Sequence, residues 1–209
     1  MTHRVTLFDY GAGNLHSLAK ALATPGVEVV IEADASRLAA SSLLVLPGVG
    51  AFTTAADRLA PAIDEIRTAI EGGLPCVGVC LGMQLLFERS EEGAGAGLGV
   101  IAGDVRRLRA RRVPQIGWNE VVPVGVDGPF ARAPLFEAYY ANSFVCAPRD
   151  ERTVLAWSEH EGDRFPAAVR AGSAIGVQFH PEKSSAAGVE FLRAMVRDGL
   201  ENRARERGA

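Results

Sequence analysis

Residues 75–84 have the sequence PCVGVCLGMQ, from which the core of the fold can be predicted. Its first five residues form a continuous apolar run, as expected of a parallel strand that is covered on both faces of a sheet. Gly78, Cys80 and Gly82 follow as G-x-C-x-G, and residues 83–88 have a helical pattern. A strand, a sharp turn and a helix in this order are the context of a nucleophile elbow. The sequence therefore predicts that Cys80 is lifted above the end of a sheet.

The elbow explains the small residues on either side of Cys80. A sharp turn brings the backbone close to neighbouring segments, which Gly78 and Gly82 permit because they lack a Cβ. A helix N-terminus behind the thiol favours the thiolate, which is the nucleophilic form. The alternative interpretation is that Cys80 is a small buried apolar side chain, the usual place of a free cysteine. The pattern favours the nucleophile.

The rest of the chain extends this strand into an α/β fold. Apolar strand patterns at residues 4–10, 27–31 and 43–46 alternate with helical stripes that begin at Leu15 and at Leu59. From about residue 100 the sequence is β-rich, and a final helix is predicted over residues 184–197 with a frayed polar tail after it. We predict one domain over residues 1–209, with a mostly parallel central sheet flanked by helices and a β-rich extension in the second half. Further strands are predicted at residues 121–124, 138–146, 153–158, 167–170 and 174–179.

Composition excludes several classes of partner. The formal net charge is −3, whereas nucleic acids and anionic membranes attract basic proteins. No apolar run approaches the length of about 18 residues that marks a membrane helix. Three cysteines are too few for a secreted disulfide framework, and no cysteine and histidine spacing matches a metal site. We expect a cytoplasmic protein without metal or cofactor that acts on a small molecule.

A thiolate nucleophile needs a partner that holds and returns a proton, and histidine suits that task near neutral pH. His180 follows the strand predicted at residues 174–179, and strand ends are where α/β folds assemble their sites. Glu182 lies two residues further along, on the same side if the chain is extended. Its carboxylate would fix the imidazole tautomer. Taken alone, His180 would equally suit a solvated strand end, and His160, among acidic residues, is predicted to lie in a solvated loop.

Three motifs together resemble the class I (triad) glutamine amidotransferases: residues 78–84 (GVCLGMQ), 47–50 (PGVG) and 178–182 (QFHPE). The resemblance implies a glutaminase with Cys80, His180 and Glu182 as its triad. It also implies an oxyanion hole formed by the loop Gly48, Val49 and Gly50 together with the backbone amide of Leu81. Gln84 would help to hold the substrate glutamine.

Finer motifs are similar to one family of these enzymes, the glutaminase subunits of imidazole glycerol phosphate synthase. They are residues 10–15 (YGAGNL), 115–119 (QIGWN) and 180–185 (HPEKSS), in order and across nearly the whole chain. The resemblance implies a heterodimer with a (β/α)8 barrel synthase subunit that makes imidazole glycerol phosphate and an aminoimidazole carboxamide ribotide in histidine biosynthesis. The side chains implied to lie toward that partner are Asn14, Trp118, Tyr139 and Lys183.

One position departs from the family pattern, and two alternatives stay open. Asn142 stands where the family stretch usually has histidine; it lies outside the implied triad, and the resemblance gives no expectation at this position for local packing or for communication with the partner. The chain could instead serve another synthase, such as those for pyridoxal phosphate or anthranilate. It could also be a catalytically silent regulatory subunit of the same fold, although the intact triad argues against this.

Overall fold

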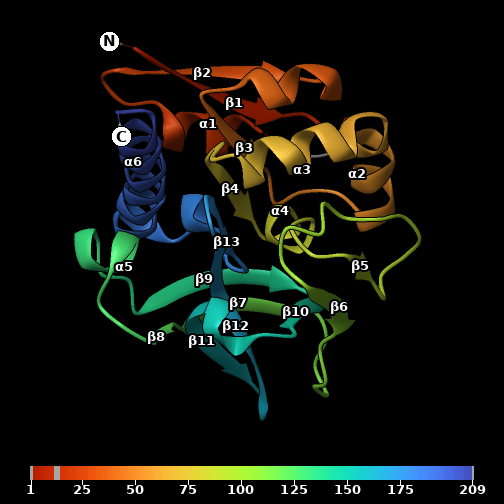
Figure 1. Ribbon diagram of the computed structural model, residues 1–209. Coiled ribbons are helices and arrows are strands. Elements are labelled where there is room, and N and C mark those ends of the chain that lie inside the picture. Colours follow the sequence, from red (N-terminus) through yellow and green to blue (C-terminus); the bar gives the residue numbers. More distant parts are fainter. Residues whose placement is uncertain (1, 12–14, 209) are drawn as a thin grey trace.

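The computed structural model describes residues 2–11 and 15–208, and a large mixed sheet crosses its centre (Figure 1). The first five strands in spatial order are parallel and the last three are antiparallel. In that order the strands are β2 (Val27–Glu32), β1 (His3–Phe8), β3 (Leu43–Leu46), β4 (Cys76–Val79), β13 (Ala174–Val177), β12 (Asp163–Ala171), β11 (Val154–His160) and β8 (Val122–Pro123). The predicted fold class is confirmed.

Two smaller sheets form the β-rich extension. One contains β10 (Phe144–Pro148), β6 (Gly103–Arg107) and β5 (Arg89–Ser90), and the other is a ribbon of β7 (Gln115–Glu120) and β9 (Glu137–Asn142). Figure 1 shows these strands at the end of the molecule opposite β1 and β2. The extension therefore faces the ends of the central strands and can cover a site there.

Helices cover both faces of the sheet, so the core has two parts. Val5 and Leu7 of β1 belong to one part and Phe8 to the other, because successive side chains of a strand point to opposite faces. One face packs against α1 (His16–Leu22), α5 (Gly128–Arg132) and α6 (Ser185–Gly208); the other packs against η1 (Ala35–Ala40), α2 (Phe52–Leu59), η2 (Ala60–Ala62) and α3 (Ile63–Glu71). The short elements α4 (Leu81–Gln84), η3 (Glu151–Thr153) and η4 (Pro181–Lys183) lie in connections.

Three local predictions away from the site were wrong. The helical stripe from Leu59 is interrupted by η2, whose second residue is Pro61; proline cannot donate to the helical ladder. The strand predicted over residues 138–146 is two strands that separate at Ser143. The tail predicted to fray is helical to Gly208, and Arg203 holds it by donating to the backbone oxygen of Ser41 at 2.7 Å.

The register of the sheet brings several strand ends to one edge. β1, β3, β4 and β13 are parallel neighbours, and Val79 of β4 pairs with Val177 of β13. The residues that follow these strands therefore meet at the carboxyl edge, where open α/β sheets bind ligands. Within the described residues, no helix is both long and apolar enough to cross a bilayer.

Candidate active site

Cys80 occupies a strained turn between β4 and α4. Its φ of 47° and ψ of −104° lie outside the regions that a side chain normally allows. Strain of this kind costs about 1–3 kcal/mol and persists only where the surroundings enforce it. The side chain is 6% exposed and opens on a pocket of about 200 Å³. The elbow geometry predicted for Cys80 is present.

Gly82 is needed for the close approach of the elbow to β3. A Cβ added to Gly82 would lie 2.0 Å from the backbone oxygen of Leu46, and one added to Gly78 would lie 2.5 Å from that of Gly82. Both contacts are with backbone atoms, which cannot rotate away as a flexible side chain does. The two glycines thus allow β3, β4 and α4 to pack against one another.

The helix behind Cys80 is shorter than predicted. The sequence pattern indicated a helix over residues 83–88, but α4 has 4 residues and ends at Gln84. Beyond it, the backbone oxygens of Leu85 and Leu86 accept from Leu98 and Ile101 rather than from a next helical turn. A short helix has few aligned peptide dipoles, so α4 stabilises a negative charge at its N-terminus less than the longer predicted helix would.

His180 and Glu182 lie together beside Cys80. The Nδ1 atom of His180 is 2.9 Å from Oε1 of Glu182, and both side chains are buried. Cys80 is close enough to the ring to raise the pKa of His180. A Cβ added to Gly48 would be 2.9 Å from Cε1 of His180 and 3.0 Å from Cβ of Cys80. The imidazole therefore lies between a thiol and a carboxylate, and only glycine fits at position 48.

The electrostatic surroundings keep the imidazole of His180 protonated. Burial by itself lowers the pKa of His180, but hydrogen bonds and charge interactions with Cys80 and Glu182 outweigh it and raise the pKa to about 10. A protonated imidazole next to a sulfur atom favours the thiolate, because opposite charges stabilise each other in a site with little water. The arrangement suits a nucleophile and its general acid.

The loop after β3 forms one wall of the site. The backbone oxygen of Pro47 accepts a hydrogen bond from the hydroxyl of Tyr10 at 3.2 Å, which fixes the start of the loop. Gly48 lies next to Cys80 and His180, as described above, and Gly50 has a φ of 108°. Leu81 is the first residue of α4, so its backbone N–H has no acceptor within the helix. Gly48, Gly50 and Leu81 therefore line the same pocket as Cys80.

The pocket beside Cys80 includes a carboxylate that the sequence did not reveal. Residues in its wall include Gly48, Gly50, Cys80, Gln84, Glu92 and Asn142. Oε2 of Glu92 accepts at 3.1 Å from the backbone N–H of Phe52, the first residue of α2. Glu92 lies next to a glycine-rich stretch with no pattern that predicts a site. Only the folded chain brings this negative charge to the pocket.

Gln84 and Asn142 share an acceptor on the wall of the pocket. Nε2 of Gln84 and Nδ2 of Asn142 donate to the backbone oxygen of Phe144 at 3.1 and 3.2 Å. Oδ1 of Asn142 is buried without a hydrogen-bond partner. Asn142, the departure from the family pattern, therefore supports the same carbonyl as Gln84 and presents a free acceptor.

Three of the four predicted partner-facing residues fall within the described chain, and Asn14 lies outside it. Trp118 is 51% exposed and contacts Tyr139 edge to face, with ring centroids 6.5 Å apart. Lys183 is exposed on η4. Ile116, two residues before Trp118 on β7, is 67% exposed and was not predicted. An exposed apolar surface of this kind is typical of an interaction site.

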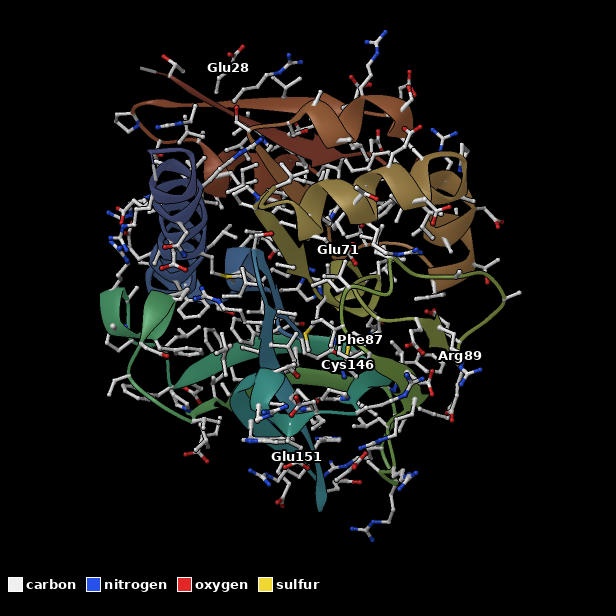
Figure 2. All side chains as sticks on the ribbon, viewed as in Figure 1. Glu28, Glu71, Phe87, Arg89, Cys146 and Glu151 are labelled. Atoms are coloured by element: carbon white, nitrogen blue, oxygen red, sulfur yellow. The ribbon has the colours of Figure 1, made fainter. Side chains whose placement is uncertain are left out.

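The remaining candidates lie away from the pocket. His160 is the last residue of β11 rather than a loop residue, and its Nε2 lies 3.0 Å from the backbone oxygen of Arg112. Cys146 lies inside the molecule (Figure 2) and is 1% exposed. Burial raises the pKa of Cys146 well above its ordinary value, with a smaller contribution from the charge of Cys80. These groups have the surroundings of structural residues.

Comparisons with known proteins identify the family of the chain. The family described as glutamine amidotransferase class-I matches residues 6–198. The chain is a class I glutamine amidotransferase of the HisH family. It is 41% identical over 200 residues to the "Imidazole glycerol phosphate synthase subunit HisH" of Synechococcus sp. (strain JA-3-3Ab), covering 92% of this chain and 93% of the relative. The protein of that name from Zymomonas mobilis subsp. mobilis is 42% identical over 200 residues, covering 90% and 92%.

Solved structures share the fold at lower identity. A crystal structure of a glutamine amidotransferase superposes with a TM-score of 0.73 at 24% identity, covering 93% of this chain and 98% of that one. The PurLQS structure from Thermotoga maritima gives a TM-score of 0.72 at 22% identity, covering 96% and 99%. These similarities support the fold alone.

Proposed function

We propose that this chain hydrolyses glutamine to glutamate and ammonia with Cys80, His180 and Glu182 as a catalytic triad. The observation that carries the proposal is the placement of the His180 imidazole between the Cys80 thiol and the Glu182 carboxylate, 2.9 Å from the latter. The carboxylate holds the imidazole in one orientation and stabilises its charge. A sulfur nucleophile on a strained turn completes the set.

The reaction divides into two steps. The Cys80 thiolate attacks the side-chain amide carbon of glutamine, and His180 gives its proton to the nitrogen as the carbon–nitrogen bond breaks and ammonia leaves. Water then attacks the γ-glutamyl thioester, with His180 taking a proton from it. The carbon–sulfur bond breaks, its electron pair returns to sulfur, and glutamate is released.

The loop of Gly48, Val49 and Gly50 would supply an oxyanion donor together with the backbone N–H of Leu81. Losing one such donor typically costs about 2.7–4 kcal/mol of transition-state stabilisation. The pocket also offers charges that suit the other end of glutamine. The Glu92 carboxylate can accept from an α-ammonium group. Gln84 has its amide N–H groups directed at Phe144 and Gln178, which leaves its carbonyl oxygen to hold the substrate.

The finer part of the proposal concerns the destination of the ammonia. Relatives at about 40% identity are named as subunits of imidazole glycerol phosphate synthase, and Ile116 and Trp118 of β7 expose apolar surface. We infer a one-to-one heterodimer in which ammonia passes to a (β/α)8 barrel subunit, with Trp118, Tyr139 and Lys183 toward that partner. Cytoplasmic residence belongs to the proposal, because the three cysteines are free and reduced thiols are typical of that compartment.

Replacement of Cys80 tests the nucleophile. Cys80→Ala should abolish glutamine hydrolysis by the complex and leave its ammonia-dependent synthase activity intact. Cys146→Ala, which removes another buried thiol, should keep both activities. A thiol-reactive glutamine analogue should label Cys80 in the unaltered chain. Glutamine hydrolysis by Cys80→Ala at the original rate would contradict the proposed triad, and a silent regulatory subunit would remain unlabelled.

The identity of the partner is tested separately. The chain is mixed with purified synthase subunits for imidazole glycerol phosphate, pyridoxal phosphate and anthranilate, and glutamate release is measured. We expect stimulation by the (β/α)8 barrel subunit of imidazole glycerol phosphate synthase. Stimulation by one of the other synthases alone would reassign the partner without affecting the triad.

A further inference from the structure

Gln178 is a fully buried side chain that touches the reactive sulfur. Its Nε2 lies 3.5 Å from Sγ of Cys80, and its Oε1 accepts from Nε2 of Gln84 at 3.4 Å. The side chain has no exposed surface. Gln178 therefore connects the nucleophile to the residue that would hold the substrate.

The hydrogen-bond network decides which end of the Gln178 amide faces sulfur. The backbone oxygen of Phe144 can only accept, so the Gln84 group 3.1 Å from it must be the NH₂ group. The same NH₂ group faces Gln178, which must present its oxygen there. The NH₂ group of Gln178 is left to face Cys80. The opposite orientation would set two donors against each other.

The sheet holds Gln178 in this position. Val177 of β13 pairs with Val79 of β4, so the residues that follow the two strands, Gln178 and Cys80, are neighbours. The backbone N–H of Cys80 donates to the oxygen of Val177 at 2.7 Å, and that of Gln178 donates to Ala167 at 2.9 Å. The contact with sulfur is therefore built from a fixed backbone.

The amide N–H of Gln178 can donate a hydrogen bond to the sulfur without transferring its proton, unlike His180. His180 exchanges a proton during each step, whereas an amide donates a hydrogen bond without giving up its proton. A hydrogen bond to a charged acceptor is stronger than one to a neutral thiol. The Gln178 N–H thus favours the thiolate before attack, and again when the carbon–sulfur bond breaks and the electron pair returns to sulfur.

We propose that Gln178 is a positioning residue of the glutaminase site, which holds the Cys80 thiolate with its N–H and the Gln84 amide with its oxygen. The inference rests on the proposed function, because it takes Cys80 as the nucleophile. A buried amide with a merely structural role would fill space and stabilise the fold without changing the ionisation of the thiol.

The test measures the rate at which iodoacetamide alkylates Cys80 across pH, in the full chain, by mass spectrometry of the peptide that contains Cys80. Burial raises the pKa of Cys76 to about 12, and Cys146 is also buried, so both should react slowly. The variant Gln178→Met removes the donor at similar side-chain length, and Gln178→Leu is a second apolar replacement should the first fail to fold. Gln115→Met is the matched control, because Gln115 is a buried amide 4% exposed on β7.

We expect both Gln178 variants to move the midpoint of the alkylation profile up by about one to two pH units. This shift corresponds to the free energy of one hydrogen bond to a charged group. Alkylation at neutral pH should slow by about tenfold or more, and Gln115→Met should follow the wild-type profile. A folded Gln178 variant with an unshifted profile would overturn the inference. Failure of iodoacetamide to prefer Cys80 in the wild-type chain would instead contradict the proposed nucleophile.

Discussion

Replacing Glu182 by glutamine removes a charge from the site and keeps its shape. The Nδ1–Oε1 distance to His180 is 2.9 Å, and the two side chains are 3% and 7% exposed. A buried hydrogen bond between charged groups is worth about 1.5–3 kcal/mol, which corresponds to about one to two pH units. In Glu182→Gln, the pKa of His180 should therefore fall from its value of about 10 to about 8 or 9.

This change can be measured by NMR titration of the Cε1 proton of His180. The chain has 4 histidines, so its signal can be assigned by comparison with His180→Asn, and the other histidines serve as references. Glutamine turnover should fall in the same variant, because a less firmly held imidazole is a poorer general acid. A midpoint for His180 that is identical in Glu182→Gln and in the wild type would refute the electrostatic role of Glu182.

The same pKa predicts how stability depends on pH. The pKa of His180 in the folded chain, about 10, is above its ordinary value of 6.5, so the folded state binds the proton more tightly than the unfolded state. The contribution of this proton is complete below about pH 6.5 and is lost as pH rises toward 10. Measured by urea unfolding, the free energy of unfolding should fall less between pH 6 and pH 9 in Glu182→Gln than in the wild type. Equal losses in both chains would contradict this explanation.

Two further predictions concern packing and charge. Gly82→Ala should lower the free energy of unfolding, measured in urea, by about 3 kcal/mol or more, because its Cβ would lie 2.0 Å from the backbone oxygen of Leu46. Gly125→Ala is the control, since the nearest atom to its Cβ would be 3.9 Å away. Equal effects of the two substitutions would rule out this steric reason. Arg106→Met should cost about 2 kcal/mol, since Arg106 donates twice to Asp163 at 2.7 Å in a largely buried pair. Arg152→Met, from an exposed pair with Asp150, should unfold like the wild type, and a loss as large as that of Arg106→Met would count against burial as the cause.

The sequence predicted the parts of the site that depend on local pattern. The strand before Cys80 and the glycines around it follow from apolar runs and from the need for close approach, and these were found. His180 could be predicted because it ends a strand in a chain that also contains an elbow. Such features are encoded within a few residues.

Features that depend on long-range contacts could not be predicted. The helix after Cys80 stops early because Leu98 and Ile101, from a distant segment, take the backbone oxygens of Leu85 and Leu86. Glu92 reaches the pocket through its contact with the start of α2, and Gln178 reaches Sγ of Cys80 through the register of β13 on β4. Periodicity within one segment contains no information about either contact.

The place of β13 in the sheet affects how the chain folds while it is being translated. Among the described strands β13 comes last in chain order, yet it fills the position between β4 and β12. Until β13 is synthesised, the apolar β4 is an open edge that neighbouring chains can join, and the whole stretch between Val79 and Ala174 must be translated first. The Cys80 thiol lacks its imidazole partner over the same period, because His180 is synthesised after β13. Nascent chains should thus need protection from association before the proposed glutaminase site is complete.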